Sequence, residues 1–487
     1  MIDLTVDPKG LENAVRRARE RGVVIPTLAQ MIDPSKIPAS VVQKLRGVGL
    51  WDVDPVNLFR INWHNEPVEK GGGFGAPNFI ELPPELTGVE ARVVAMVGKW
   101  FPTGAHKVGA AFGCLVPRLV TGQFDPTTHK AVWPSTGNYC RGGAYDSALL
   151  GCESIAILPA GMSRERFAWL EKVAGEVIKT PGTESNVKEI FDKCWELRKS
   201  GQALTIFNQF EEMGNYLWHH EVTGRAMAEV AERLLGPRGK MAGLAVTTGS
   251  AGTIASGDYL KKRFPGAKIA ASEAAECPTL LRNGFGEHRI EGIGDKHVPW
   301  IHNVRNTDMV MAIQDEAALS MIRLFNEPEG KRHLASRGVS PEVIERLPLI
   351  GISGAANILS AIKMAKWYEL GRESVVMTVL TDSIDMYRSR LEEMRQTRGE
   401  FLALHAAVAH ERWVLGAGTD LIEELTYPDR KRVHNLKYYT WVEQQGRTHE
   451  EIQALWSEDT WASVPAQAGE LDRLIDEFNA RTGLAAH

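Results

Sequence analysis

The stretch "KAVWPSTGNYCRGGAYDSALLGCESIAILP", residues 130–159, runs from an apolar segment through a small polar turn and an amphipathic segment into a second apolar segment. Short β-branched runs on either side of a longer helical pattern predict a strand, a helix and a second strand. The same alternation extends from about Val93 to Leu380, in runs such as "ARVVAMV", "SRERFAWLEKVAG", "GLAVTTG" and "VVMTVLTDS". The sequence therefore predicts an α/β fold of parallel twisted sheets flanked by helices.

The length of the chain predicts more than one lobe. A chain of 487 residues exceeds the size at which a single hydrophobic core keeps growing. We expect an N-terminal extension over 1–54, a larger lobe built from 55–90 and 211–390, and a smaller lobe over 91–210. The remaining block, 391–487, is rich in Trp, Glu and Arg and predicts a mainly helical C-terminal extension.

Composition narrows the class of protein. Hydrophobic residues make up 44% of the chain, charged residues 24%, and the net charge is -5, values that argue against a nucleic-acid partner. The five cysteines are scattered, without the CxxC spacing of a zinc site, and fit reduced thiols. No stretch has the length of an apolar membrane span, and the first residues do not resemble a signal peptide. We expect a cytoplasmic protein with no membrane partner.

One lysine stands out in "FPTGAHKVGAA", residues 101–111. Lys107 has small neighbours that would let a flat cofactor approach the backbone, at Gly104, Ala105, Gly109, Ala110 and Ala111. In a partly desolvated pocket the pKa of a lysine amine falls, and the amine can form a Schiff base with an aldehyde. Taken alone, the motif fits an exposed lysine at the start of a helix at least as well.

Three further loops lie where predicted strands end and helices begin. In "TTGSAGT", backbone N–H groups and a hydroxyl can bind a phosphate at the positive end of the next helix, from Gly249, Ser250, Ala251, Gly252 and Thr253. In "PSTGNY", a polar nest can hold a carboxylate, from Ser135, Thr136, Gly137, Asn138 and Tyr139. In "GISGAAN", Ser353 lies at a strand-to-helix junction. The first loop alone is equally consistent with a turn that caps a helix, and each of the other two alone favours such a capping turn.

In this order, the four stretches resemble the fold-type II pyridoxal-phosphate enzymes, the family of cysteine synthase, cystathionine β-synthase, threonine synthase, the serine dehydratases and the tryptophan synthase β chain. "TGAHK" is similar to the lysine motif of that β chain, "PSTGN" to the family's "PTSGN", and "GSAGT" to its "GTGGT". "HRIEGIG" and "VLTDSIDMY" resemble "HKIQGIG" and "LPSSGERY". The resemblance covers roughly residues 90 to 390 and implies the two-lobed fold of this family, with the phosphate bound by the larger lobe.

The resemblance also implies roles for individual residues. Lys107 would hold pyridoxal 5'-phosphate as a Schiff base and then move the α-proton of the substrate. The loop 249–253 would bind the phosphate, Asn138 the ring 3'-oxygen and Ser353 the pyridine nitrogen. The substrate carboxylate would be bound by Ser135, Thr136, Gly137, Asn138, Tyr139 and Gln209. His106 would contact the phosphate or serve as a helix-capping side chain.

The implied reaction is α,β-elimination or β-replacement on an L-serine- or L-cysteine-type β-substituted amino acid through an aminoacrylate. A hydroxyl such as that of Ser353, unlike a carboxylate, does not hold the pyridine nitrogen protonated, so the ring is a milder electron sink. The alternatives are a serine or threonine dehydratase-like ammonia-lyase and a threonine synthase-like enzyme. A non-catalytic scaffold is disfavoured because the lysine, the asparagine, the phosphate loop and the serine are all present.

Departures from the family pattern gather where a leaving group would be recognised. Tyr139 stands in place of the family's threonine and would add a ring beside the substrate. Asp295, Lys296 and His297 would place charged groups in a loop that is uncharged in the sulfhydrylases, either as an acid or base or as surface charges. The sequence contains no HExxH spacing, so we expect no metal site. By analogy with the family we expect a homodimer that acts on a small amino acid.

Overall fold

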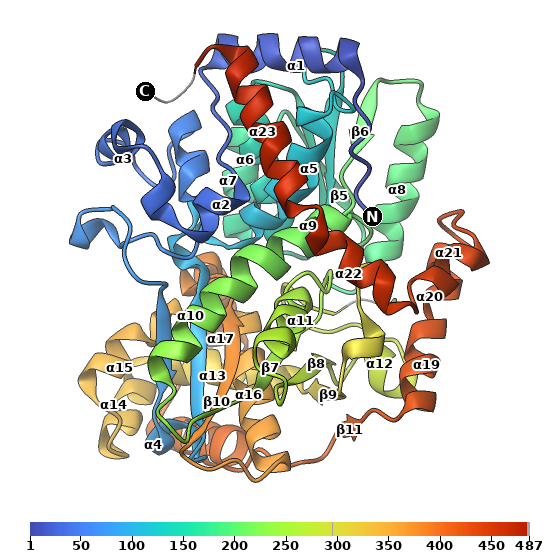
Figure 1. Ribbon diagram of the computed structural model, residues 1–487. Helices are drawn as coiled ribbons and strands as arrows, with labels where there is room; N and C mark the ends of the chain where they lie inside the picture. The colour runs from blue at the N-terminus through green and yellow to red at the C-terminus, as the bar shows by residue number, and fades with distance from the viewer. Residues whose placement is uncertain (295, 485–487) are drawn as a thin grey trace.

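Two separate β-sheets organise the chain (Figure 1). The computed structural model describes residues 1–294 and 296–484. One sheet has seven strands in the order β1-β2-β10-β7-β8-β9-β11, and the other has four in the order β5-β4-β3-β6. Each sheet is the centre of one lobe, so the α/β fold with two lobes is confirmed.

The stretch 130–159 forms one strand–helix–strand unit of the smaller sheet, as predicted. It comprises β3 (Lys130–Pro134), α6 (Asn138–Leu150) and β4 (Ser154–Pro159). The two strands are parallel, with Ala131 opposite Ser154. The sheet is completed by β5 (Glu176–Thr180) and β6 (Leu204–Ile206), and the helices of this lobe include α5 (Lys107–Val120), α7 (Arg164–Val173) and α8 (Val187–Lys199). All four strands run parallel, so their carboxyl ends share one edge.

The seven-stranded sheet has a parallel centre and antiparallel edges. Its strands are β1 (Phe79–Leu82), β2 (Arg92–Val97), β7 (Lys240–Thr247), β8 (Lys268–Ala274), β9 (Met309–Ile313), β10 (Ser374–Leu380) and β11 (Ile422–Glu424). β10 is buried along its whole length, which explains its nearly unbroken apolar sequence. Helices α10 (Gly224–Leu234), α11 (Ile254–Arg263), α13 (Asp315–Asn326) and α16 (Ile352–Trp367) pack around this sheet.

One boundary differs from those expected from the sequence, and one short strand was not predicted. β2 pairs with β1 and β10, so residues 92–97 belong to the larger sheet and not to the smaller lobe. The C-terminal extension is mainly helical, as expected, and β11 adds one antiparallel edge strand next to β9. Both strands are assigned by long-range pairing, which local sequence patterns do not report.

The C-terminal extension runs from the larger lobe back to the smaller one. Helix α23 (Ala468–Thr482) lies beside α1 (Pro8–Arg21) in Figure 1 and also contacts α5. On the larger lobe, the buried Lys437 amine donates to the carbonyl oxygens of Trp300 and His302, each at 2.8 Å. The extension therefore ties the two lobes together on one side of the molecule.

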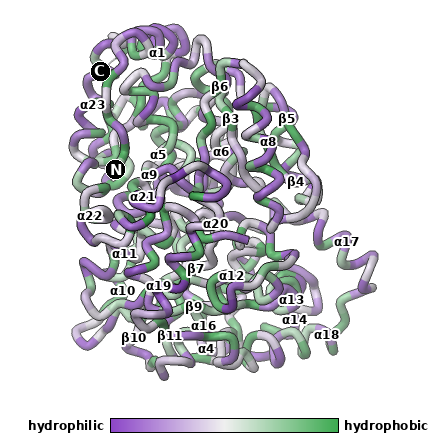
Figure 2. The backbone as a smooth tube through the Cα atoms, turned by 90° about the vertical axis from the view of Figure 1, so that its right-hand side faces the viewer, coloured by the Kyte–Doolittle hydropathy of each residue, from purple (hydrophilic) through white to green (hydrophobic). Residues whose placement is uncertain are grey.

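The distribution of apolar and polar residues follows the arrangement of the two sheets and their helices. Figure 2 shows apolar residues concentrated on the inner strands and helices, and polar residues on the outer helices. Across residues 1–294 and 296–484, no helix is both long enough and apolar enough to cross a membrane.

Candidate active site

Lys107 lies in the first turn of α5 and faces residues of both lobes. Its Nζ donates to Oε1 of Gln209 at 3.2 Å. A Cβ added to Gly249 would lie 3.7 Å from the same Nζ. The structure thus brings together the lysine, the glutamine and the first glycine of the proposed phosphate loop, three groups that are far apart in the sequence.

Two of the glycines near Lys107 lie against tryptophan side chains. A Cβ on Gly109 would overlap the indole ring of Trp218, and a Cβ on Gly104 would lie 2.6 Å from that of Trp51. Thr103 and Gly104 both have positive φ, at 69° and 72°, so the loop before the lysine turns tightly. These glycines make room for tryptophan side chains and for a turn, whereas Gly249 lies beside the lysine amine itself.

The loop 249–253 lies where the sequence predicts a phosphate site, directly before α11. Its N–H groups therefore lie at the positive end of a helix. The Ser250 hydroxyl accepts hydrogen bonds from Nδ2 of Asn215 at 3.1 Å and from the N–H of Gly252 at 3.4 Å. A Cβ on Gly252 would lie 2.8 Å from Cδ2 of His219, so only glycine fits there. Asn215 and His219 belong to no motif of the sequence that points to this site.

His106, the neighbour of Lys107, is fully buried at the edge of this loop. Its Nε2 lies 3.3 Å from the Thr381 hydroxyl, and its ring stacks on Trp63 and meets the edge of His219. Burial, with the nearby Lys107 charge, lowers the pKa of His106 to about 3. His106 is therefore a neutral group at neutral pH, and a role in binding the phosphate stays a prediction.

The loop 135–139 is held in one shape from two sides. The Ser135 hydroxyl accepts from the N–H of Gly137 at 3.1 Å. A Cβ on Gly137 would lie 2.6 Å from the Arg166 side chain, so this position requires glycine. Nη1 of that buried guanidinium donates to the Thr136 carbonyl at 2.9 Å and fixes the loop from behind.

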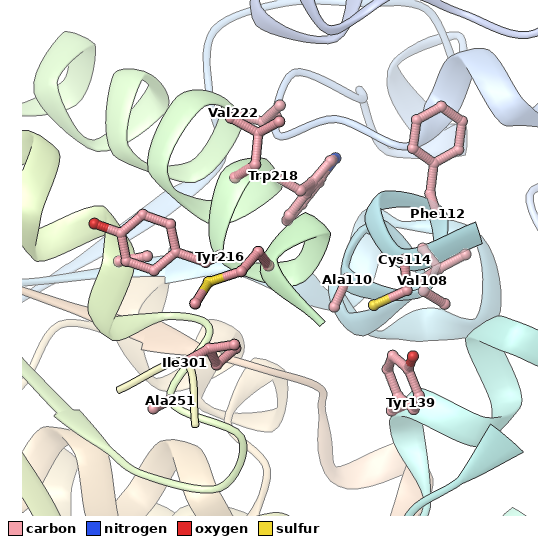
Figure 3. Packing of buried hydrophobic residues seen from close by; sticks show 14 of the residues in the cluster. Val108, Ala110, Phe112, Cys114, Tyr139, Tyr216, Trp218, Val222, Ala251 and Ile301 are labelled. Atoms are coloured by element: carbon pink, nitrogen blue, oxygen red, sulfur yellow. The ribbon is translucent and has the colours of Figure 1, made fainter. Parts of the chain in front are cut away.

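Asn138 and Tyr139 point in different directions. Nδ2 of Asn138 donates to Oδ2 of Asp382 at 2.7 Å. The Tyr139 hydroxyl donates to the Phe207 carbonyl at 3.1 Å, and Figure 3 shows its ring below Cys114 of α5. The structure does not bring Tyr139 to the substrate side of the loop, because the side chain that follows Asn138 on a helix turns away into the core.

Ser353 lies in the first turn of α16, as its motif predicts. A Cβ on Gly292 would lie 3.6 Å from its Oγ, so the loop "HRIEGIG" passes directly beside it. Within the described chain, Ser353 Oγ and Asn138 Oδ1 are buried and have no hydrogen-bond partner. Two polar atoms left without partners at one site are an arrangement that a polar ligand would complete.

A buried ionic cluster behind the loop is the largest feature that the sequence did not reveal. Arg166 is fully buried, and its nitrogens lie 3.3 Å from Glu291, 3.8 Å from Glu184 and 3.9 Å from Asp382. Burial raises the pKa of Glu184 to about 7, with Arg166 acting in the opposite direction. The residues come from both lobes, and the segment "SRER" by itself does not predict that its second arginine is buried.

Lys296 and His297 of the charged loop expected to recognise a leaving group lie in different surroundings. Asp295 lies outside the described residues, and Lys296 is exposed. The His297 ring is buried among Phe191, Phe210 and Trp441, with ring centroids at 5.7, 4.9 and 6.0 Å. Burial lowers the pKa of His297 to about 3, so its surroundings favour a core histidine over an acid or base.

Comparison with known proteins defines the class to which this fold and site belong. The family model described as "Pyridoxal-phosphate dependent enzyme" matches residues 85–339. The chain belongs to this family and is a pyridoxal-phosphate-dependent enzyme, so the cofactor expected from the sequence is confirmed.

Two relatives and one solved structure show which members of this family the chain is similar to. The chain is 30% identical over 290 residues to a cysteine synthase of Staphylococcus aureus (strain Mu50), covering 59% of this chain and 84% of that protein. It is 28% identical over 300 residues to a probable cysteine synthase of Bacillus subtilis, covering 61% and 89%. A solved O-acetylserine-dependent cystathionine β-synthase from Helicobacter pylori shares the fold, with a TM-score of 0.54 and 23% identity over 65% of this chain and 95% of that one.

The residues at the site fit pyridoxal phosphate. Lys107 supplies an amine for its aldehyde, and the loop 249–253 supplies N–H groups for its phosphate. The unpartnered Asn138 and Ser353 atoms within the described chain supply polar contacts for a ring between them. These assignments follow the family resemblance residue by residue and stay proposals for this chain.

Proposed function

We propose that this enzyme catalyses α,β-elimination or β-replacement on a β-substituted L-amino acid of the serine or cysteine type. The observation that carries the proposal is the position of Lys107, whose amine lies within hydrogen-bond distance of Gln209 and beside Gly249. An amine held there can act on the cofactor and on the α-carbon of a substrate bound at the adjacent loop. The similarity to cysteine synthases supports the same reaction class.

Lys107 has two tasks in this reaction. It holds the cofactor before substrate binds, and after its release its amine takes the α-proton of the substrate. Gln209 accepts from Nζ at 3.2 Å and so limits the directions in which that amine can point. A proton acceptor held in one direction is more effective than a mobile one, because less orientation is lost at the transition state.

The loop 135–138 binds the substrate carboxylate in this proposal. The Ser135 hydroxyl and the Arg166 guanidinium hold the turn from two sides, so its shape is set before a ligand arrives. Arg166 itself acts at a distance, since it donates to the Thr136 carbonyl and not to a ligand. A carboxylate bound here orients the α-carbon toward Lys107.

Pyridoxal phosphate, when bound, supplies an aldehyde for the substrate amine and a ring that accepts electrons as the α-proton leaves. The protein contributes the burial of the site, which excludes water from a reactive product until the next step. If water reaches the buried site next, a keto acid and ammonia are released. If a second nucleophile reaches it, that nucleophile is added instead.

The test uses the holoenzyme and a panel of β-substituted L-amino acids. We expect a shift of the visible absorbance band with at least one member of the panel, together with release of its β-substituent. Keto acid and ammonia in the product mixture would identify elimination, and a new β-substituted amino acid would identify replacement. No shift and no release with any member of the panel contradicts the proposal.

A lysine variant tests the role of Lys107 in the same assay. Lys107→Ala should lose the band that borohydride reduction abolishes in the wild type. Lys130→Ala is the matched control, because Lys130 pairs with the exposed Glu153 at the opposite end of β3 from the loop 135–139. A Lys107→Ala protein that keeps a reducible band would show that another amine holds the cofactor.

We also propose, by analogy with the family, that the enzyme is a cytoplasmic homodimer that acts on a free amino acid. Light scattering of the purified holoenzyme measures the oligomeric state. A monomeric mass would contradict the dimer without affecting the proposed reaction.

A further inference from the structure

Asp382 is a buried carboxyl group in the motif "VLTDSIDMY", to which the resemblance assigned no role. It follows β10 by two residues and is fully buried. Its Oδ2 accepts hydrogen bonds from Nδ2 of Asn138 and from the Tyr387 hydroxyl, both at 2.7 Å. Its Oδ1 is also buried and has no hydrogen-bond partner among residues 1–294 and 296–484.

The position of Oδ1 explains a second feature of the chain. A Cβ on Gly351 would overlap this oxygen, so the glycine before α16 leaves space for the carboxyl group. Ser353, whose Oγ is likewise buried without a partner in the described chain, lies two residues further along. Asp382 Oδ1 and Ser353 Oγ are therefore two unpartnered acceptors at the start of one helix, where the helix dipole favours negative charge.

Two arginines act on this carboxyl. Arg166 on α7 lies 3.9 Å from Oδ2, and Arg141 on α6 also lowers the pKa of Asp382. Burial acts in the opposite direction and, as the largest influence, raises that pKa. Glu291 and Glu184 face the same Arg166 at 3.3 and 3.8 Å and compete with Asp382 for its charge.

The pairing with Asn138 gives the carboxyl a direct effect on the site. An amide nitrogen carries two hydrogens. One is used by Asp382, so the amide is held with its nitrogen toward the carboxyl, and the second hydrogen is left for a ligand. Asn138 is the residue to which the resemblance assigns the ring oxygen of the cofactor.

We propose that Asp382 is a positioning residue of this site, which fixes the Asn138 amide through Oδ2 and accepts a hydrogen bond from a protonated nitrogen of bound pyridoxal phosphate through Oδ1. The proposal rests on the proposed function and on the placement of the cofactor between Asn138 and Ser353. A carboxylate stabilises a protonated nitrogen far more than a hydroxyl does. The bound ring is then a stronger electron acceptor than the reasoning from Ser353 alone implies.

The test is a pH titration of the visible absorbance band of the bound cofactor in Asp382→Asn. Loss of the negative charge should lower the pH midpoint of the spectral transition by about one unit or more, a tenfold change in proton affinity. The cofactor should also bind more weakly, as measured by dialysis against increasing pyridoxal phosphate. Asp385→Asn is the matched control, since Asp385 lies in the same turn but pairs with Lys99 and Arg388 nearer the surface.

The outcomes separate this proposal from the function on which it rests. A wild-type band with unchanged midpoints in both variants overturns the role of Asp382 and leaves the proposed reaction intact. No band in the wild-type protein supplied with cofactor overturns the proposed function itself. A midpoint shift of equal size in Asp385→Asn also overturns the proposal, because it would reflect a general change of surface charge.

A second variant keeps the test decisive if Asp382→Asn does not fold. Asp382→Ser also removes the charge but leaves a small hydroxyl, and circular dichroism establishes whether it is folded. If neither variant folds, Ser353→Ala in the otherwise wild-type protein decides whether Asp382 or Ser353 is the partner of the nitrogen. A site in which Asp382 acts should keep its pH midpoint in Ser353→Ala, whereas a shift of about one unit or more would assign the nitrogen to Ser353 and overturn the proposal.

Discussion

The Arg166 guanidinium donates to the Tyr387 hydroxyl at 2.8 Å, and this contact joins the smaller lobe to the larger one. Arg166 lies on α7 and Tyr387 follows β10. The same guanidinium holds the Thr136 carbonyl, so the loop 135–139 and the interface between the lobes depend on one buried side chain. Any change in the separation of the lobes therefore reaches this loop through Arg166.

Arg166→Met should destabilise the protein strongly. It removes the positive charge from three buried carboxyl groups, and breaking a buried ion pair by removing one partner costs about 3–5 kcal/mol. Urea unfolding measures the loss. The control is Arg164→Met, whose side chain is 76% exposed and should change the free energy of unfolding by no more than about 0.5 kcal/mol. Equal effects of the two variants would contradict a structural role for the buried cluster.

Gln209→Leu should impair catalysis more than folding. The change removes the acceptor for the Lys107 amine while keeping a similar volume, so the amine is less well directed. We expect kcat/KM to fall about ten- to hundredfold, the range for loss of one hydrogen bond to a charged or reacting group. Steady-state kinetics on the best substrate of the panel provides the measurement. Gln202→Leu, at an exposed position nearby in the chain, should retain wild-type kinetics.

The buried His297 should make the protein sensitive to acid. Its pKa is about 3 in the folded state because burial disfavours the charged ring, whereas in the unfolded chain it is near the ordinary value of 6.5. The unfolded state therefore binds a proton first, and stability present above pH 6.5 is lost as the pH falls toward 3. His297→Phe should remove this loss, with a gain over the wild type of about 2–3 kcal/mol at about pH 4.5.

Unfolding experiments between neutral and acidic pH test this expectation. The difference in free energy of unfolding between His297→Phe and the wild type should grow as the pH falls. His449→Phe makes the same substitution at an exposed position and is the matched control. A constant difference for His297→Phe would mean that the ring can take up a proton in the folded protein.

Asp146 should have the opposite dependence on pH. It is buried on α6, and within the described chain neither carboxyl oxygen has a hydrogen-bond partner, so burial raises its pKa well above the ordinary value. The unfolded chain loses the proton at lower pH than the folded protein does. Stability is therefore greatest below pH 3.8 and falls as the pH rises toward the raised folded value.

Asp146→Asn tests this loss of stability at rising pH, because an asparagine side chain cannot ionise. At neutral pH the variant should be more stable than the wild type by more than about 1.4 kcal/mol, because each pH unit between 3.8 and the raised folded pKa costs the wild type about 1.4 kcal/mol. Near the ordinary carboxyl pKa of 3.8 the two proteins should be nearly equal in stability. Asp476→Asn, at an exposed position, should have no such trend. A variant less stable than the wild type at neutral pH would mean that the Asp146 charge is compensated.

The sequence predicted the parts of this protein that depend on local patterns. The unit from β3 to β4 and the helix that begins at Lys107 follow from apolar periodicity and from small or polar residues at strand ends. The short strand β11 escaped prediction because three residues carry little periodicity and its partner β9 is distant in the chain. Local patterns lack information about such pairings.

The candidate site also has a part that the sequence predicted and a part that it did not. Lys107, the loop 249–253 and Ser353 were assigned to the site because their short motifs together resemble those of the family, and their roles stay predictions. Asp382 and Arg166 could not be assigned in this way, because their roles come from contacts between segments that only the folded chain brings together. The motif "PSTGNY" places Tyr139 beside the substrate, but the direction of a helical side chain sends it to the Phe207 carbonyl instead.

The contact between Gly109 and Trp218 offers the last prediction. A Cβ at Gly109 would overlap the indole ring, which is itself fully buried. Gly109→Ala should therefore lower the free energy of unfolding by about 1–3 kcal/mol, the usual cost of overpacking a core. If the glycine instead served the approach of a cofactor, the variant would keep its stability and lose cofactor affinity.

A double-mutant cycle separates these two explanations. Trp218→Phe shrinks the ring and should by itself destabilise the protein through a cavity, but it should also make room for the methyl group that Gly109→Ala introduces. The combined variant should then be more stable than the sum of the single effects predicts, by about 0.5 kcal/mol or more. Strictly additive effects would show that the two side chains do not compete for the same space, and the glycine would need another explanation.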